Sequence, residues 1–355
     1  MIKTEGQNLL NRVECNVMRG FAIMAVASNN FGHLIKNVIQ DNEFVYDYSQ
    51  IIGFLEALKH PGQILPLDFL AFFSPFGVML FIFLSGYGLT LKYERGDGKL
   101  IDHKTFVMDH YTKLFQMQIK GLAIFLLVMF IFNSNYIVYF RHLVGQILMV
   151  ENLNPIDPII LAGPYWFFGM IMEVYIIYRF AIYRRSSSFV IVVSLLSLIL
   201  MAFCEPNGQT IRYLRINFLM AILPFCLGVL VARYESFLQL LYGNRMRCWA
   251  SLVFFLTLLT ISKFCFYTWL VMPLFIVGLS ISLAKIIFST HLISVVFEWI
   301  GGLSGIIFVI HPIVREILIE RTNLSGNYFG MFFVYLLMTL VLSVIFKPIF
   351  SKKAN

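Results

Sequence analysis

The chain has 355 residues, of which 59% are hydrophobic and only 13% are charged. A water-soluble domain usually carries about 25% charged residues, and a globular core of this size hides far less apolar surface. The formal net charge of +8 does not indicate nucleic-acid binding, because Lys and Arg fall in the short links between apolar segments. The composition excludes a soluble protein and predicts an all-α, polytopic membrane protein in contact with membrane lipid.

A helix that crosses a bilayer needs about 20 mostly apolar residues. Segments of this kind recur about ten times, so we expect a single transmembrane domain over residues 1–355. The expected spans are residues 17–36, 69–91, 119–140, 159–179, 188–204, 216–233, 248–263, 267–287, 297–313 and 328–346. Most Lys and Arg fall in alternate links, which are the cytoplasmic ones by the positive-inside rule. We therefore expect both termini to be cytoplasmic.

The link over residues 92–118 is basic and is expected on the cytoplasmic side. Its end, from Phe106 to Phe115, mixes apolar and polar residues at helical spacing. Such a segment is typical of a helix that lies along the membrane interface. We therefore expect it to rest on the inner surface, separate from the following span.

Ionisable side chains inside the expected spans are costly, which makes them functional candidates. Arg19, His33 and Glu173 stand out on this ground. Each also has a structural interpretation that stays open. Arg19 fits an anchor at the inner interface, His33 fits the outer water boundary, and Glu173 fits a buried partner of a neighbouring helix.

Five short motifs follow one another along the chain. They are Arg19 to Val26, Gly77 to Tyr87, Tyr165 to Phe168, Leu227 to Tyr234, and Ser304 to Pro312. In this order they resemble the motifs of the acyltransferase 3 family of bacterial integral membrane acyltransferases. The resemblance covers nearly the whole chain.

The resemblance implies an enzyme that moves an acyl group, usually acetyl, from cytoplasmic acyl-CoA (acetyl-CoA) to a carbohydrate hydroxyl. The acceptor is expected to be a cell-surface polysaccharide or its lipid-linked precursor, which makes polysaccharide synthesis machinery the expected partner. The expected location is the bacterial inner membrane, in multi-pass form. Neither a metal nor a nucleic acid is expected to take part.

The resemblance also implies residue roles. In the family a His follows the Arg by eleven residues, and it removes the proton of the acceptor hydroxyl. Here that position is Asn30, and an amide is no general base. His33 lies on the same helical stripe as Arg19, about one helical turn beyond Asn30. We therefore predict that His33 is the general base and that Asn30 orients it or the substrate.

Donor binding is expected at Arg19, whose planar guanidinium suits the phosphates of CoA. The family has an Arg-x-x-Arg motif before its third span, where this chain has Lys113 and Gln116. We expect Lys113 to assist Arg19. His311 precedes Pro312 in the last motif and is expected to help place the acceptor; a helix-terminal role favoured by the dipole stays open.

Two other functions stay open because the expected His and the second basic residue are missing. One is an exporter of a glycan or of a lipid-linked intermediate on the same helical scaffold. The other is a non-catalytic family member. Acyl-CoA turnover by the purified protein distinguishes the enzyme from both.

Overall fold

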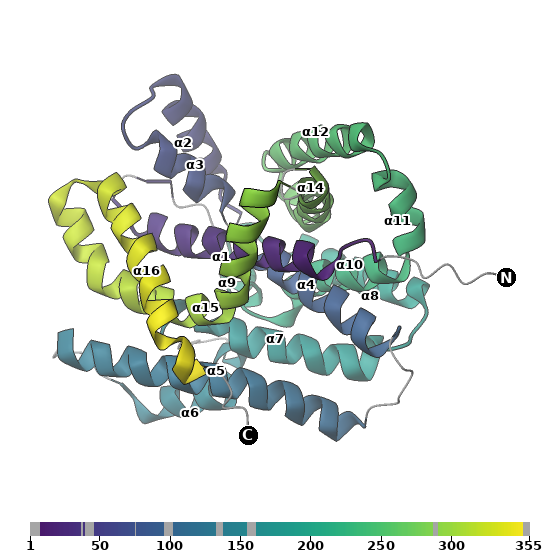
Figure 1. The fold of residues 1–355 in the computed structure, drawn as a ribbon, viewed down its shortest axis with the longest axis horizontal. Coiled ribbons are helices and arrows are strands. Elements are labelled where there is room, and N and C mark those ends of the chain that lie inside the picture. The colour runs from purple at the N-terminus through teal and green to yellow at the C-terminus, as the bar shows by residue number, and fades with distance from the viewer. Residues whose placement is uncertain are drawn as a thin grey trace.

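The computed structural model describes residues 8–36, 38–39, 46–74, 76–95, 102–132, 138–154, 161–286 and 290–350. All regular secondary structure within these ranges is helical, which confirms the predicted all-α class. The first helix, α1 (Arg12–Gly32), lies across the middle of the molecule, with the other helices arranged around it (Figure 1).

The helices differ widely in length. Up to residue 182 they are α1, α2 (Tyr48–Lys59), α3 (Leu65–Phe73), α4 (Phe76–Tyr93), α5 (His103–Phe132), α6 (Phe140–Leu148), the turns η1 (Glu151–Leu153) and η2 (Gly163–Tyr165), α7 (Trp166–Ile177) and η3 (Tyr178–Ile182). The others are α8 (Ser187–Ala202), α9 (Gln209–Leu214), α10 (Phe218–Arg233), α11 (Glu235–Tyr242), α12 (Arg245–Ser262), α13 (Phe266–Trp269), α14 (Met272–Ile286), α15 (His291–Ser325) and α16 (Tyr328–Phe350).

Every predicted span overlaps at least one of these helices. In the described part of the chain, six helical stretches are long and apolar enough to cross a membrane. The number rises to seven if α10 and α11, which meet at a bend of 87°, form one span. The multi-pass membrane class is thus supported, whereas the count of ten spans and the cytoplasmic termini stay predictions.

The third predicted span begins earlier than expected. Residues 106–115 were expected to lie separately along the inner interface, but they are the first part of α5. The side chain of Asp102 accepts the Thr105 amide hydrogen and caps this helix at its start. Neither Gly nor Pro occurs between His103 and Lys120, so nothing interrupts the backbone ladder before the apolar part begins.

The helices α1 and α15 are in close contact and run in the same direction. Near their beginnings, a side chain on Gly20 would come within 3.1 Å of the backbone nitrogen of Gly301. Towards their ends, the amide of Asn323 donates to the carbonyl oxygen of Leu34 at 3.1 Å. The first and the penultimate long helix of the chain therefore form one central pair.

Charged residues predicted to be cytoplasmic meet at one end of the molecule. Arg233 of α10 forms a two-pronged ion pair with Glu94, through Nε at 2.9 Å and Nη2 at 3.0 Å. Next to it, Glu235 accepts hydrogen bonds from Arg95 and from the hydroxyl of Tyr87. Arg233, near the end of the fourth motif, and Glu235 therefore hold the junction of α10 and α11 against the end of α4.

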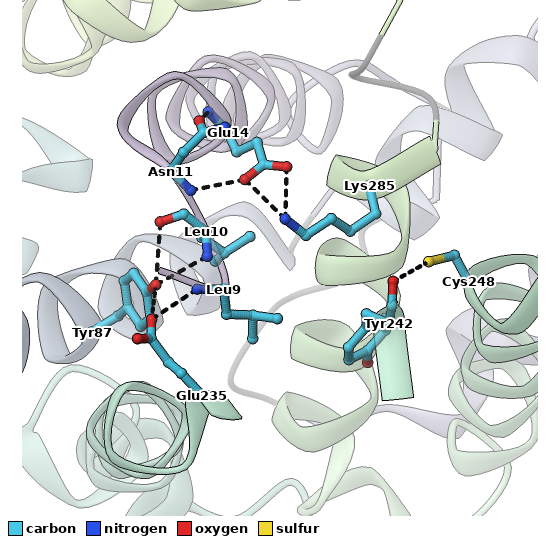
Figure 2. A network of polar contacts seen from close by, with 9 residues as sticks. All are labelled: Leu9, Leu10, Asn11, Glu14, Tyr87, Glu235, Tyr242, Cys248 and Lys285. Atoms are coloured by element: carbon cyan, nitrogen blue, oxygen red, sulfur yellow. Dashed lines mark hydrogen bonds and ion pairs between the residues drawn. The ribbon is translucent and has the colours of Figure 1, made fainter. Parts of the chain in front are cut away.

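The first described residues, from Leu9 to Glu14, are held at the same end (Figure 2). The backbone nitrogen of Leu9 donates to Glu235 at 3.2 Å, and Lys285 of α14 pairs with Glu14 at 2.9 Å. Glu14 and Asn11 also cap each other's backbone at the first turn of α1. These contacts fix the position of α1 along its axis, which places its polar residues at defined levels.

Candidate functional site

A cavity of about 290 Å³ lies among α1, α4, α5, α7 and α15. Four phenylalanines form much of its wall, namely Phe81, Phe167, Phe168 and Phe308. Among the residues that line it, only Lys113 and Ser304 carry polar side chains. A concave apolar space with few polar groups is typical of a ligand site.

The levels of the cavity residues follow from the packing of α5 against α15. Gly305 lies at Met117, because a side chain on Gly305 would come within 3.0 Å of the Met117 methyl carbon. A side chain on Gly121 would likewise come within 2.7 Å of Val309. The two helices therefore run in the same direction. Lys113 lies one turn before this contact on α5, towards the end of the molecule where Arg233 pairs with Glu94.

Arg19, Asn30 and His33 share one face of α1 with Val26, which lines the cavity. At about 100° per residue, these four positions fall within about 60° of one another. Arg19 is half-buried, about two turns before Val26, and its Nη1 donates to Asn16 of the same helix at 3.0 Å. The predicted stripe therefore faces the cavity, with Arg19 and His33 beyond its two ends.

Asn30 and His33 do not pair with each other. The Asn30 amide donates to the carbonyl oxygen of Val26 at 2.9 Å, within its own helix. His33 caps the end of α1, and its Nδ1 contacts the carbonyl oxygen of Asn29 at 2.7 Å. The structure thus provides no contact through which Asn30 orients His33. The role of Asn30 towards the substrate stays a prediction.

His311 lies immediately beyond the end of the cavity that is opposite Lys113. It follows Ser304 by seven residues on the same face of α15, and its ring centroid is 5.9 Å from that of Phe308. The side chain is fully buried. Nδ1 is 3.0 Å from the carbonyl oxygen of Ile307, which can only accept a hydrogen bond, so Nδ1 carries the proton. Nε2 then holds the lone pair, and no described residue donates to it.

The cavity has Lys113 among its lining residues, and His311 lies just behind its wall residue Phe308. If Met117 is level with Gly305, Lys113 and His311 are about ten residues apart along parallel helices, or about 15 Å. Lys113 is exposed, so its ammonium group lies at the mouth of the cavity. Gln116 is also exposed and is not among the lining residues.

Glu173 has the structural role that the sequence left open. Its two carboxylate oxygens accept hydrogen bonds from the Asn152 amide at 2.6 Å and from the Phe218 backbone nitrogen at 2.9 Å. It joins α7 to η1 and to the start of α10, and it does not line the cavity.

The sequence did not reveal a buried polar network beside the cavity. Gln118 of α5 donates to the Gln146 carbonyl oxygen at 2.7 Å, and the Gln146 side chain donates to Glu151 at 3.0 Å. Gln118 stands at the edge of an apolar run, which was the available signal. Its partners come from a separate part of the chain that no local pattern links to it. Arg315 follows His311 by one helical turn on α15 and lies outside every motif noted in the sequence.

Comparison with known sequences gives one match. Residues 12–347 match the acyltransferase domain of the acyltransferase 3 family, a range that includes all five cavity helices. No curated protein and no solved structure matches the chain. Since the match spans most of the sequence and the helices are apolar enough to cross a membrane, this integral membrane protein belongs to the acyltransferase 3 family.

Proposed function

We propose that the protein transfers an acyl group from cytoplasmic acyl-CoA to a hydroxyl of a cell-surface carbohydrate or its lipid-linked precursor, in the bacterial inner membrane. One observation carries this proposal. The apolar cavity has a lysine at its mouth, and a buried histidine packs behind its wall residue Phe308, about 15 Å from Lys113 along the helix axes. That separation suits the extended pantetheine arm of CoA, with its phosphates at one end and its thioester at the other.

The donor end is basic. Lys113 at the mouth is a mobile point charge for a phosphate group, and Arg19 lies on the same side of the cavity on α1. The apolar wall that follows excludes water from the thioester, which limits hydrolysis of the donor.

At the other end, His311 acts as the general base. Its Nε2 takes the proton of the acceptor hydroxyl while the oxygen attacks the thioester carbonyl carbon. Collapse of the tetrahedral intermediate breaks the C–S bond. The thiolate of CoA then receives the proton from His311, so the products are the ester and free CoA. His33, half-buried nearer the outer end, contacts the acceptor.

This assignment gives His311 the role that the sequence gave to His33. Both rings have Nδ1 at a backbone carbonyl, so both present Nε2 as a base. Only His311 combines this tautomer with full burial beside a cavity residue. A base needs to lie within hydrogen-bonding reach of the reacting hydroxyl; we therefore place the thioester at the Phe308 end of the cavity, next to His311.

The test is acyl-CoA turnover by the purified protein in detergent, with release of the CoA thiol as the readout. Turnover that is lost in Arg19→Ala and in His311→Gln, with both variants folded, supports the enzyme. If the wild-type protein releases no thiol while its deletion still abolishes export of a surface glycan, the exporter interpretation replaces it. The acylation state of the glycan in the same deletion strain then stays unchanged.

A further inference from the structure

The residue one turn beyond His311 is a buried arginine. Arg315 is 8% exposed, and it lies on α15 about 6 Å further along the axis than His311. Its Nε and Nη2 both donate to one oxygen of the adjacent Glu316, at 3.1 and 2.5 Å. No residue that the structure describes accepts a hydrogen bond from Nη1. One edge of the guanidinium is therefore available to a ligand.

The space around this guanidinium is shaped by a glycine. A side chain on Gly163 would come within 3.0 Å of Nη2 and 3.3 Å of Nη1 of Arg315. Gly163 also has a φ of +44°, which L side chains rarely adopt. It begins η2, and the residues just after η2, including Phe167, line the cavity. Arg315 thus occupies a cradle at the point where the cavity wall begins.

A second arginine approaches the same region from another part of the chain. Arg215 ends α9, is half-buried, and makes no ion pair with any residue in the described ranges. Arg215 and Arg315 both lie within electrostatic reach of His33. Glu316 neutralises one of the two positive charges, and its side chain is partly exposed. A net positive charge therefore remains beside His33.

We propose that Arg315 and Arg215 form an anion subsite that binds a carboxylate or phosphate group of the carbohydrate acceptor. This inference rests on the proposed function for the identity of the ligand. Guanidinium groups bind both anions through paired N–H donors. The subsite lies at the His311 end of the cavity, opposite Lys113, so it does not serve the phosphates of CoA. An anion held there places a hydroxyl of the same sugar near Nε2 of His311.

A binding measurement tests the subsite without any turnover. The purified protein in detergent is titrated with methyl glucuronide and with methyl glucoside, which differ by one carboxylate. We expect the glucuronide to bind at least tenfold more tightly. Arg215→Gln should remove this preference, and Arg315→Lys, which keeps the charge but loses the fork, should weaken it. The loss of a charged hydrogen bond corresponds to about a 10- to 100-fold effect.

The matched control is Arg321→Gln, which removes an exposed arginine further along α15. It should keep the preference for the glucuronide, since it lies outside the cradle. Equal binding of the two glycosides in the wild type, together with no Arg215-dependent binding of a phosphate-linked glucose, overturns the proposal, as does an equal loss of preference in Arg321→Gln. Because Arg315 is buried, the melting temperature of each variant is recorded, and Arg215→Gln decides the matter if Arg315→Lys does not fold.

Two further arms identify the source of the anion. A polyprenyl phosphate-linked glucose in nanodiscs presents a phosphate, and methyl glucuronide presents a carboxylate. With acyl-CoA added, the preferred anion should raise kcat/KM over the neutral glycoside, and Arg215→Gln should reduce that ratio. If anion binding depends on Arg215 but no acyl transfer occurs, the result supports the subsite and contradicts the proposed function. If acyl transfer proceeds equally well to neutral acceptors, the result contradicts the subsite and supports the proposed function.

Discussion

Gly20 of α1 and Gly301 of α15 lie against each other where the two helices cross. A Cβ on Gly301 would come within 1.9 Å of the carbonyl oxygen of Asn16, and one on Gly20 would come within 2.1 Å of that of Phe297. Both obstacles are backbone atoms, so no side-chain rotation relieves them. This close approach of backbones is typical of small residues at membrane helix interfaces.

Gly301→Ala should therefore separate α1 from α15. We expect a destabilisation of about 1–3 kcal/mol, the usual cost of overpacking, together with loss of acyl transfer because the cavity depends on both helices. Gly302→Ala is the matched control, since nothing lies within 4 Å of a Cβ there. The measurement is the melting temperature in detergent. A similar melting temperature for both variants contradicts the crossing geometry.

His311→Gln should lower kcat by about 10²–10⁴-fold, the range in which general bases contribute. Glutamine can still donate to the carbonyl oxygen of Ile307, so the fold should be retained. His33→Gln should have a smaller effect on kcat and a larger one on the KM for the acceptor. His291→Gln, at the exposed start of the same helix, is the control. If His33→Gln loses kcat completely while His311→Gln turns over normally, His33 is the general base and His311 is not.

Lys113→Gln should raise the KM for acyl-CoA about tenfold, because a charged hydrogen bond to phosphate is lost at the mouth of the cavity. The side chain is exposed, so the melting temperature should not change. Lys104→Gln removes an exposed lysine from the first turn of the same helix and should leave the KM as it is. Equal changes in both variants would indicate a general charge effect and not a phosphate site.

The stability of the protein should fall as the pH rises towards 8. Burial raises the pKa of the Glu151 carboxyl from 4.5 to about 8, and the Glu173 charge acts in the same direction. Between these values the folded protein keeps a proton that the unfolded chain releases, so rising pH favours unfolding. The slope is at most about 1.4 kcal/mol per pH unit.

Glu151→Gln should flatten this dependence, since glutamine stays neutral and can still accept from Gln146. The readout is the melting temperature in detergent between pH 5 and pH 8. Glu205→Gln removes an exposed carboxylate and serves as the control. If the wild type and Glu151→Gln lose stability in parallel, then Glu151 is not the group responsible.

Most of the long helices could be predicted from the sequence, because each one corresponds to a long continuous run of apolar residues. The predicted spans 248–263 and 267–287, for example, correspond to α12 and α14. The short helices α2, α6 and α9 were not predicted. They carry too few residues for periodicity to be distinctive, and their stability comes from packing against neighbours that are distant in sequence.

The candidate site was only partly accessible. Motif positions led to Lys113 and to the Ser304–Phe308 segment, both of which line the cavity. The preference for His311 over His33 depends on burial and on hydrogen bonds of the ring, which no spacing reveals. The cradle of Arg315 depends on Gly163, about 150 residues away, whose approach is fixed by tertiary packing alone.

The pairing of α1 with α15 has a consequence for biosynthesis. The two contact points are about 280 residues apart, so at ordinary translation rates α1 waits in the membrane for roughly 15–60 s before its partner is made. During that interval its small, polar-striped face needs another neighbour, such as the insertion machinery or α4. Since the cavity has walls from both helices, a nascent chain lacks the complete reaction chamber until translation is almost finished. Under the proposed function, an unfinished chain therefore has no complete site at which an acyl donor could react.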